Sequence, residues 1–264
     1  MIDTHCHLEQ PDYDADRAHV IATCQTQLHA VVTSCAHPQH LDTTLHLVNA
    51  YPGFVFAAAS LHPRYVNDFS DDASNAYLDR IRAHRAHLVA IGETGLDHNW
   101  ITDAPGQAKQ RRLFSRMINL AQQLDLPLVI HSRDATDATI QVLEDHHAHR
   151  VQMHMFTSRP LLPRVLHNHW SISVNTLLLR SKTVKKLVRD CPLDHIMLET
   201  DAPWLGVGTD GNLKPKHLVR NTPTAVLQVA QKIADIKHLP LTRVDEQTTA
   251  NAIAFFHLPL QPAQ

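Results

Sequence analysis

Glycine is scarce in this chain, and the glycine patterns of nucleotide-binding folds are missing. The 264 residues include only seven glycines, and no Gly-x-Gly-x-x-Gly or Walker loop follows any apolar run. Such loops need glycine because the backbone must approach the phosphates of the nucleotide closely. The sequence therefore argues against a dinucleotide- or nucleotide-binding fold.

Cysteine pairs and long apolar runs are absent as well. The four cysteines are scattered without a Cys-x-x-Cys pair, which argues against a zinc ribbon and against a disulfide framework. No run approaches 18 apolar residues, and no basic segment followed by an apolar one opens the chain, so neither a membrane helix nor a signal peptide is expected. We expect a cytoplasmic protein without a membrane partner, and no obligatory protein partner is evident.

A large excess of charge of either sign is also lacking. The 24 basic and 26 acidic residues give a formal net charge of -2. This balance provides no general attraction to nucleic acids or anionic membranes, so an anionic substrate would have to be held by local groups or by metal. Hydrophobic residues make up 44% of the chain, which is typical of a globular protein with a large core.

Eight short apolar runs recur along the chain, and most are followed by a segment with helical spacing. The expected strands are Met1–Thr4, Ala30–Thr33, Phe54–Ser60, Leu88–Ile91, Leu126–Ile130, Val151–Met155, Trp170–Val174 and His195–Leu198. Helices are expected over Lys109–Leu124, Thr224–Ile236 and Leu241–Phe256. Alternating strands and helices predict an α/β protein with a parallel sheet, and eight units favour a (β/α)8 TIM barrel formed as a single domain over residues 1–264. An open sheet is the alternative.

Side chains that bind metals follow these apolar runs. His5 and His7 are two residues apart in an expected strand, so both rings project from the same face. In a chain with 22 histidines, a His-x-His pair on its own is as easily an accident of composition as a metal site. The further ligand candidates after later strands are Glu93, His131, His154 and Asp201, and His62 follows the third run as a candidate substrate contact.

Each candidate has an ordinary structural alternative. His131 could be a hydrogen-bonded core histidine, Glu93 could pair with Arg133, and Asp201 could cap a turn. In a barrel, however, the carboxyl ends of all strands meet at the face that carries active sites. Six such side chains at strand ends therefore favour a metal centre over six coincidences.

Five segments of the chain resemble the TatD-type metal-dependent hydrolases, relatives of the amidohydrolase superfamily. They are Asp3-Thr-His-Cys-His-Leu8, Leu61-His-Pro63, Ile91-Gly-Glu-Thr-Gly-Leu-Asp97, Ile130-His-Ser-Arg-Asp-Ala135 and Leu198-Glu-Thr-Asp-Ala-Pro203. The resemblance covers the chain almost end to end. It implies a TIM barrel with a two-metal site that hydrolyses phosphodiester bonds in DNA.

The resemblance also implies a role for each candidate. His5, His7 and Asp201 would hold one metal, His131 and His154 would hold the other, and Glu93 would bridge them. The mixed imidazole and carboxylate set suits Zn²⁺ or Mn²⁺, with Mg²⁺ less favoured. Asp201 is the best candidate general base, with Glu93 beside it in the catalytic centre. Asp97 could orient a ligand.

The sequence also suggests four substrate contacts. They are His62, Arg133, Arg220 and Trp204. His62 could instead belong to a turn before Pro63, and Arg133 could form an ion pair. Trp100 and Trp204 are candidates to stack on bases, and simple packing is the alternative for Trp204.

Two loops depart from the family pattern. His154-Met-Phe-Thr-Ser158 replaces His-Cys-Phe-Ser-Gly, and His217-Leu-Val-Arg-Asn-Thr-Pro223 replaces Arg-Gly-Lys-Arg-Asn-Glu-Pro while keeping Arg220. These changes bear on the substrate rather than on the metal site. The sequence predicts a metal-dependent deoxyribonuclease of the 3'-5' exonuclease type acting on DNA or another phosphodiester. The alternatives are a hydrolase of a carboxylic ester or amide on the same barrel, and a non-catalytic metal-binding scaffold.

Overall fold

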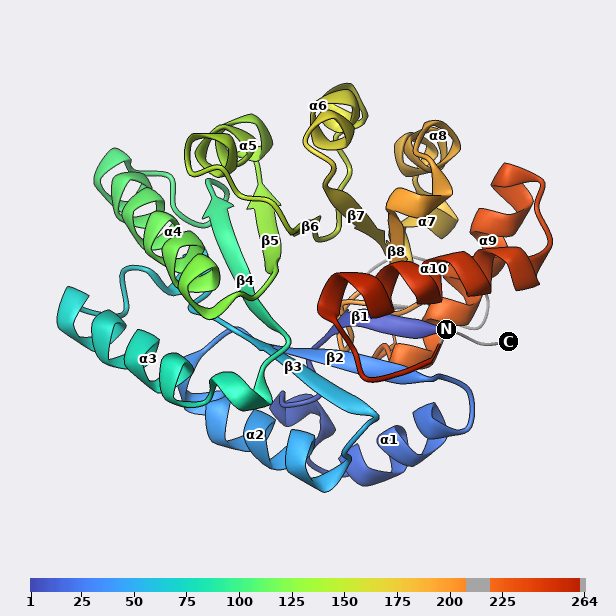
Figure 1. The fold of residues 1–264 in the computed structure, drawn as a ribbon, viewed down its shortest axis with the longest axis horizontal. Coiled ribbons are helices and arrows are strands. Elements are labelled where there is room, and N and C mark those ends of the chain that lie inside the picture. Colours follow the sequence, from blue (N-terminus) through green and yellow to red (C-terminus); the bar gives the residue numbers. More distant parts are fainter. Residues whose placement is uncertain (208–218, 262–264) are drawn as a thin grey trace.

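The computed structural model describes residues 1–207 and 219–261, and its centre is a single sheet of eight parallel strands in the order β1 to β8. Figure 1 shows the strands as a ring with the helices outside it. The strands are β1 Ile2–Cys6, β2 Ala30–Cys35, β3 Val55–Ala59, β4 Ala90–Asp97, β5 Leu128–Arg133, β6 Val151–Met153, β7 Ser171–Val174 and β8 Ile196–Leu198. This arrangement confirms the predicted (β/α)8 barrel and excludes the open doubly wound sheet.

The ring comes together where the first and last strands meet. Adjacent strands from β1 to β8 pair in parallel. Beyond β8, the Asp201 N–H donates to the His5 carbonyl at 2.9 Å, and the His7 N–H donates to the Ala202 carbonyl at 2.7 Å. Within the strands, the Thr4 hydroxyl donates to the Leu198 carbonyl at 2.8 Å. These bonds attach His5 in β1 and His7 just after it to the segment that carries Asp201.

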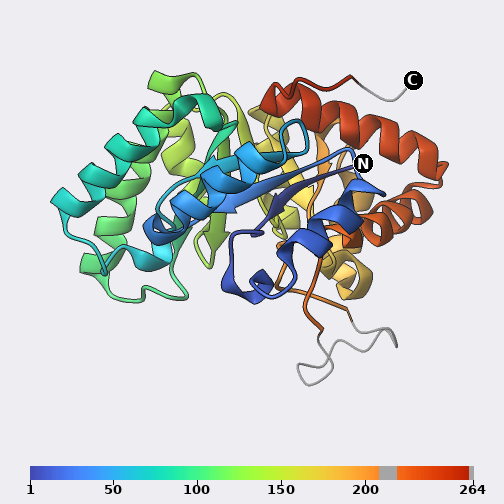
Figure 2. The same cartoon turned by 90° about the horizontal axis from the view of Figure 1, so that it is seen from below.

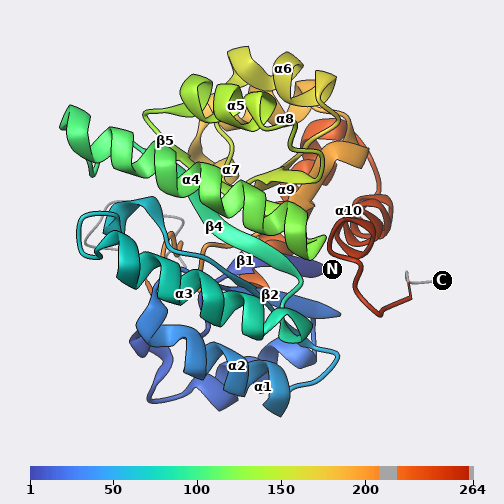
Figure 3. The ribbon, with the colours of Figure 1, turned by 60° about the vertical axis from the view of Figure 1, so that its left-hand side comes forward.

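Ten α-helices surround the strands in the part of the chain that is described. They are α1 Arg17–Gln25, α2 Leu41–Ala50, α3 Asp71–Ala83, α4 Ala104–Leu124, α5 Thr136–Asp145, α6 Leu162–His167, α7 Leu177–Arg180, α8 Lys182–Asp190, α9 Val226–Lys237 and α10 Leu241–Phe256. In Figure 3, α4 lies between α3 and α5 on the outside of the barrel. None of the helices in the described ranges is long and apolar enough to cross a bilayer.

The predicted helices form for the expected physical reason. In α4, Leu113, Met117 and Leu120 are buried at three- and four-residue steps, so one stripe of the helix packs on the sheet. The helix begins earlier than predicted because Asp103 caps it, its carboxylate accepting from the Gly106 N–H at 2.8 Å. The last helix, α10, has the predicted bounds, and the N-terminus lies beside it (Figure 2). The Met1 ammonium pairs with Asp245 at 2.8 Å.

Candidate metal centre

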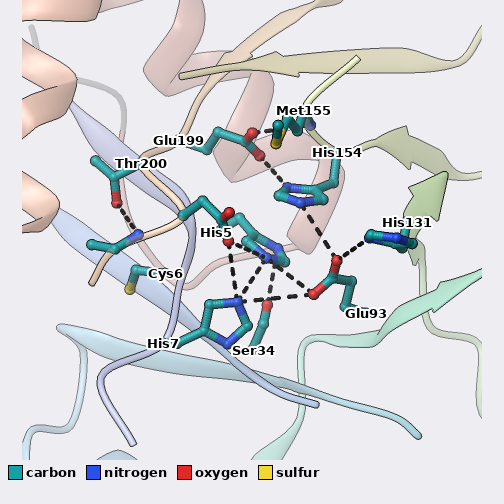
Figure 4. A network of polar contacts seen from close by, with 12 residues as sticks. His5, Cys6, His7, Ser34, Glu93, His131, His154, Met155, Glu199 and Thr200 are labelled. Carbon is teal, nitrogen blue, oxygen red and sulfur yellow. Dashed lines mark hydrogen bonds and ion pairs between the residues drawn. The ribbon is translucent and has the colours of Figure 1, made fainter. Parts of the chain in front are cut away.

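The end of β1, the middle of β4 and the segment after β8 bring four of the predicted ligands together. The Nε2 atom of His5 lies 3.2 Å from His7 Nε2, 3.6 Å from Glu93 Oε2 and 3.7 Å from Asp201 Oδ1. The distance from His7 Nε2 to Asp201 Oδ1 is 3.4 Å. Figure 4 shows both rings turned toward the Glu93 carboxylate. Two imidazole nitrogens and two carboxylate oxygens therefore face one point.

The other oxygen of Glu93 faces a second group of rings. Glu93 Oε1 lies 2.7 Å from His131 Nδ1 and 3.5 Å from both His154 Nε2 and His62 Nε2. The two oxygens of one carboxylate thus divide the histidines into two sets, one from β1 and one from the ends of β3, β5 and β6. This is the geometry expected of a residue that bridges two cations.

The spacing of the donors fits a metal ion. Around an ion with bonds of about 2.1 Å to its ligands, neighbouring donor atoms are about 3.0 Å apart in an octahedral site and about 3.4 Å apart in a tetrahedral site. The separations of 3.2 to 3.7 Å from His5 Nε2 are close to these values. Two ring nitrogens 3.2 Å apart either share one proton in a hydrogen bond or, when neither carries a proton there, both present lone pairs to a shared cation.

Three of the rings are oriented by a buried carboxylate on the side away from the centre. The pairs are His7 Nδ1 with Glu9 Oε1 at 3.2 Å, His131 Nε2 with Asp97 Oδ2 at 2.8 Å, and His154 Nδ1 with Glu199 Oε2 at 2.8 Å. A ring that donates its proton to a carboxylate presents the lone pair of its other nitrogen to the centre. Asp97 thus has the orienting geometry that the sequence suggested, whereas the roles of Glu9 and Glu199 were not predicted.

Glu199 orients His154 through a filled hydrogen-bonding shell. Besides the His154 ring, its carboxylate accepts from the Ser173 hydroxyl at 2.5 Å, the Met155 N–H at 2.9 Å and the Asn175 amide at 3.2 Å. Donor atoms of His5, His154 and Glu199 also cluster within 4.8 Å of one another. Because both oxygens of Glu199 already accept two hydrogen bonds, we assign it to positioning rather than to ligation.

Electrostatics keep the central carboxylates ionised. Burial raises the pKa of Glu93, but His62, His154 and the hydrogen bond from His131 outweigh it and hold the pKa well below its usual range. Burial likewise opposes ionisation of Asp201, yet His7 and His154 leave its pKa lowered. Burial lowers the pKa of His154, but the negative charges of Glu199 and Glu93 outweigh burial and raise the pKa to about 9. Without metal, the His154 ring therefore holds a proton at a position where a metal ion would bind.

A cavity of about 690 Å³ opens over the centre. Three of the four predicted substrate contacts, His62, Arg133 and Trp204, line it together with Glu93 and Asp201. Trp204 is 45% exposed, and its ring centre lies 4.7 Å from that of His7. The volume is in the range of sites that enclose small ligands.

The structure does not bring Arg220 to this cavity. Its guanidinium donates to the Asp12 carbonyl at 2.7 Å, pairs with Asp16 at 2.5 Å and lies 4.9 Å from the centre of the Tyr13 ring. Its donors are engaged by the segment before α1, and it is not among the residues that line the cavity. The altered residue His217 lies outside the described residues.

The barrel places six side chains around one point, a group we call the cage: His5, His7, Glu93, His131, His154 and Asp201. A TIM barrel with this donor set defines a metal-dependent hydrolase. The sequence pattern of the family described as "TatD related DNase" matches residues 2–257. The chain belongs to the TatD family of metal-dependent hydrolases.

Relatives support this assignment over the whole chain. The human protein "Deoxyribonuclease TATDN3" is 33% identical over 97% of this chain and 94% of its own length. The "3'-5' ssDNA/RNA exonuclease TatD" of Erwinia tasmaniensis is 28% identical over 98% of this chain and 100% of its own. The crystal structure of YJJV, a TatD homologue from Escherichia coli K12, superposes with a TM-score of 0.87 at 25% identity, covering 98% of each chain.

Proposed function

We propose that this protein is a deoxyribonuclease that hydrolyses phosphodiester bonds from the ends of DNA strands in the 3'-5' direction. The relatives named as deoxyribonuclease and as 3'-5' exonuclease support the substrate and the polarity. The observation that carries the proposal is the position of Asp201. Its carboxylate lies in the cage, 3.4 Å from His7 Nε2, and also lines the cavity that Arg133 and Trp204 share.

Two divalent cations, Zn²⁺, Mn²⁺ or Mg²⁺, fit the donor set. His5, His7 and Asp201 would hold one, His131 and His154 the other, and the two oxygens of Glu93 would face both. When bound, such ions lower the pKa of water and stabilise charge on phosphoryl oxygens.

The side chains of the centre divide the remaining work. The side chain of Asp201 is 16% exposed against 6% for Glu93, so it is the carboxylate with better access to a water in the cavity. Its lowered pKa keeps it ionised and able to take the proton when the water oxygen attacks phosphorus. The bond from phosphorus to the leaving sugar oxygen then breaks. In this proposal His62 and Arg133, which line the cavity, contact the phosphate, and Trp204 stacks on the terminal base.

The substitution Asp201→Asn tests the proposal. It preserves the shape of the side chain but removes the proton acceptor, so we expect turnover of single-stranded DNA by the Mn²⁺-loaded protein to fall about 10²- to 10⁴-fold. Asp79→Asn, on the exposed face of α3, is the matched control and should change nothing. A panel of lactones and cyclic amides is assayed in parallel. Turnover of these compounds without turnover of DNA would overturn the nuclease assignment and leave the ester or amide hydrolase.

A further inference from the structure

Arg64 and Trp100 form a stacked pair at the exposed edge of the cavity. Arg64 lies in the short 3-10 helix Pro63–Tyr65 after β3, and Trp100 lies in the loop after β4. The guanidinium carbon of Arg64 is 3.9 Å from the centre of the Trp100 ring and 5.6 Å from that of Tyr65. Both residues line the cavity, and Trp100 is 50% exposed. The pair thus lies at the entrance to the metal centre.

The cation of this pair has no counterion in residues 1–207 and 219–261. The guanidinium of Arg64 makes no ion pair and no hydrogen bond there, whereas those of Arg17, Arg164 and Arg220 pair with carboxylates. Stacking on an aromatic face leaves the in-plane N–H donors of an arginine available to an anion. An uncompensated arginine held beside a cavity has donors that suit a phosphate.

A buried carboxylate fixes this pair relative to the metal centre. Asp97 Oδ2 contacts His131 Nε2 at 2.8 Å, while Asp97 Oδ1 accepts from the N–H groups of Asn99 at 3.0 Å and Trp100 at 2.8 Å. On the other side of the pair, the Arg64 N–H donates to His62 Nδ1 at 3.0 Å, and His62 faces Glu93. Trp100 and Arg64 are therefore each tied to a ring of the centre.

We propose that Arg64, held on the face of Trp100, binds a second phosphate next to the one that is hydrolysed. The inference rests on the proposed nuclease function and adds a specificity residue to it. His62 reaches the centre, and Arg64, two residues further along the chain, lies toward solvent. It therefore contacts the neighbouring phosphate and not the reacting one. The protein then prefers substrates with at least two phosphates over a dinucleotide with one.

Short thymidine oligonucleotides separate the two phosphates. The dinucleotide dTpdT carries one phosphate, the trinucleotide dTpdTpdT carries a second internal one, and pdTpdT carries a second terminal one. In Arg64→Ala and Arg64→Gln we expect kcat/KM on the two-phosphate substrates to fall about tenfold through KM, with kcat/KM on dTpdT unchanged. Dependence on Arg64 for dTpdTpdT assigns an internal neighbour, and dependence for pdTpdT alone assigns a terminal phosphate. Both outcomes support the subsite.

Variants of Trp100 and of a remote arginine provide further controls for the test. Trp100→Ala should reproduce part of the Arg64→Ala effect, Trp100→Phe should keep most of the wild-type preference, and the double variant should be less than additive. Arg189→Ala is the matched control because Arg189 is an exposed arginine at the end of α8 that does not line the cavity. Equal losses on dTpdT and on both two-phosphate substrates, or no loss on any of the three, would overturn the proposal.

A binding measurement distinguishes failure of the subsite from failure of the proposed function. Anisotropy of fluorescein-labelled hexathymidylate is followed in chelator, where no hydrolysis is expected. Arg64→Ala should weaken binding and reduce the slope of log affinity against log salt by about one. Unchanged affinity and slope would overturn the subsite even if the protein is a nuclease. Inactivity of the wild type on every oligonucleotide would overturn the proposed nuclease function. A loss of binding in Arg64→Ala would still support a phosphate site at Arg64.

Discussion

Buried carboxylates that never face the cavity decide how the metal-binding rings are presented. Glu9, Asp97 and Glu199 each hold one nitrogen of a histidine and leave the other nitrogen turned to the centre. Glu9 is itself held by the Thr33 hydroxyl at 2.6 Å. An imidazole with a fixed tautomer and ring plane loses less entropy on binding metal than a free one. Metal affinity should therefore depend on residues that make no contact with the ion.

Glu199→Gln tests this dependence. The substitution keeps the size of the side chain but removes the charge that holds His154 Nδ1–H, so we expect metal affinity to fall about 10- to 100-fold. Competition with a chromophoric chelator measures the affinity, and Glu246→Gln on the exposed face of α10 is the control. Unchanged affinity in Glu199→Gln would show that His154 is oriented without this carboxylate.

Metal binding should also depend on pH, in a direction set by the histidines. The pKa of His154 is raised to about 9, and hydrogen bonds to carboxylates overcome burial to raise the pKa of His7 and His131 as well. Below these pKa values the rings carry protons that a metal must displace. Affinity should therefore rise from pH 6 to pH 9, and binding at pH 7 should release protons. Calorimetry in buffers with different ionisation enthalpies measures the release; a heat independent of buffer would contradict the prediction.

The sequence predicted the residues of the cage better than their partners. The six candidates follow apolar strands, so the barrel rule alone places them on one face. The pair His154–Glu199, by contrast, spans 45 positions and forms only because β6 and β8 bring the two residues together. The pair His7–Glu9 is local in the sequence, but Glu9 lies in the turn after β1, where no strand pattern predicts the contact. Arg220 turns to Asp16 for a tertiary reason that no local pattern contains.

At the scale of the element, β4 and β5 differ most from their predicted bounds. The hydrophobic pattern ended at Ile91 and Ile130, but the strands continue to Asp97 and Arg133. Pairing between them persists through polar residues, including Leu96 with Ser132 and Asp97 with Arg133. The register shifts between Gly92 and Thr94, where Glu93 points into the centre. Hydrophobicity alone underestimates strands whose last residues carry the chemistry.

Gly95 lets these two strands approach each other beside the site. Its φ is +147°, and a Cβ there would lie 1.9 Å from the His131 carbonyl oxygen. Gly95→Ala combines an unfavourable backbone conformation with a backbone clash, so we expect it to lower the free energy of unfolding by about 3 kcal/mol or more. Gly53→Ala is the control, because Gly53 also has a positive φ, +78°, but has open space around it. Its cost should be about 1–2 kcal/mol. Urea denaturation compares the two, and equal costs would mean that the close approach at Gly95 contributes nothing.

At the scale of the whole molecule, the proposed centre is a product of barrel closure. Its ligands come from β1, β4, β5 and the segments after β6 and β8, and bonds such as that from the Asp201 N–H to the His5 carbonyl join the first and last of these. Residues so far apart in the sequence do not form the cage in an unfolded chain. Metal should therefore bind the native state far more tightly than the unfolded one, and its binding energy should add to the stability of the barrel.

Removal of metal should accordingly lower the melting temperature of the entire barrel in one step. At a free metal concentration 100 times Kd, binding stabilises the native state by about 2.7 kcal/mol. For a chain of this size each kcal/mol corresponds to about 2–4 °C, so a chelator should lower Tm by about 5–10 °C. The variant with both His5→Ala and His7→Ala lacks two of the six ligands, so its Tm should respond much less to Mn²⁺ or to chelator than that of the wild type. Calorimetric scans with and without metal measure both. A Tm of the wild type that is the same in Mn²⁺ and in chelator would contradict the coupling of the centre to the fold.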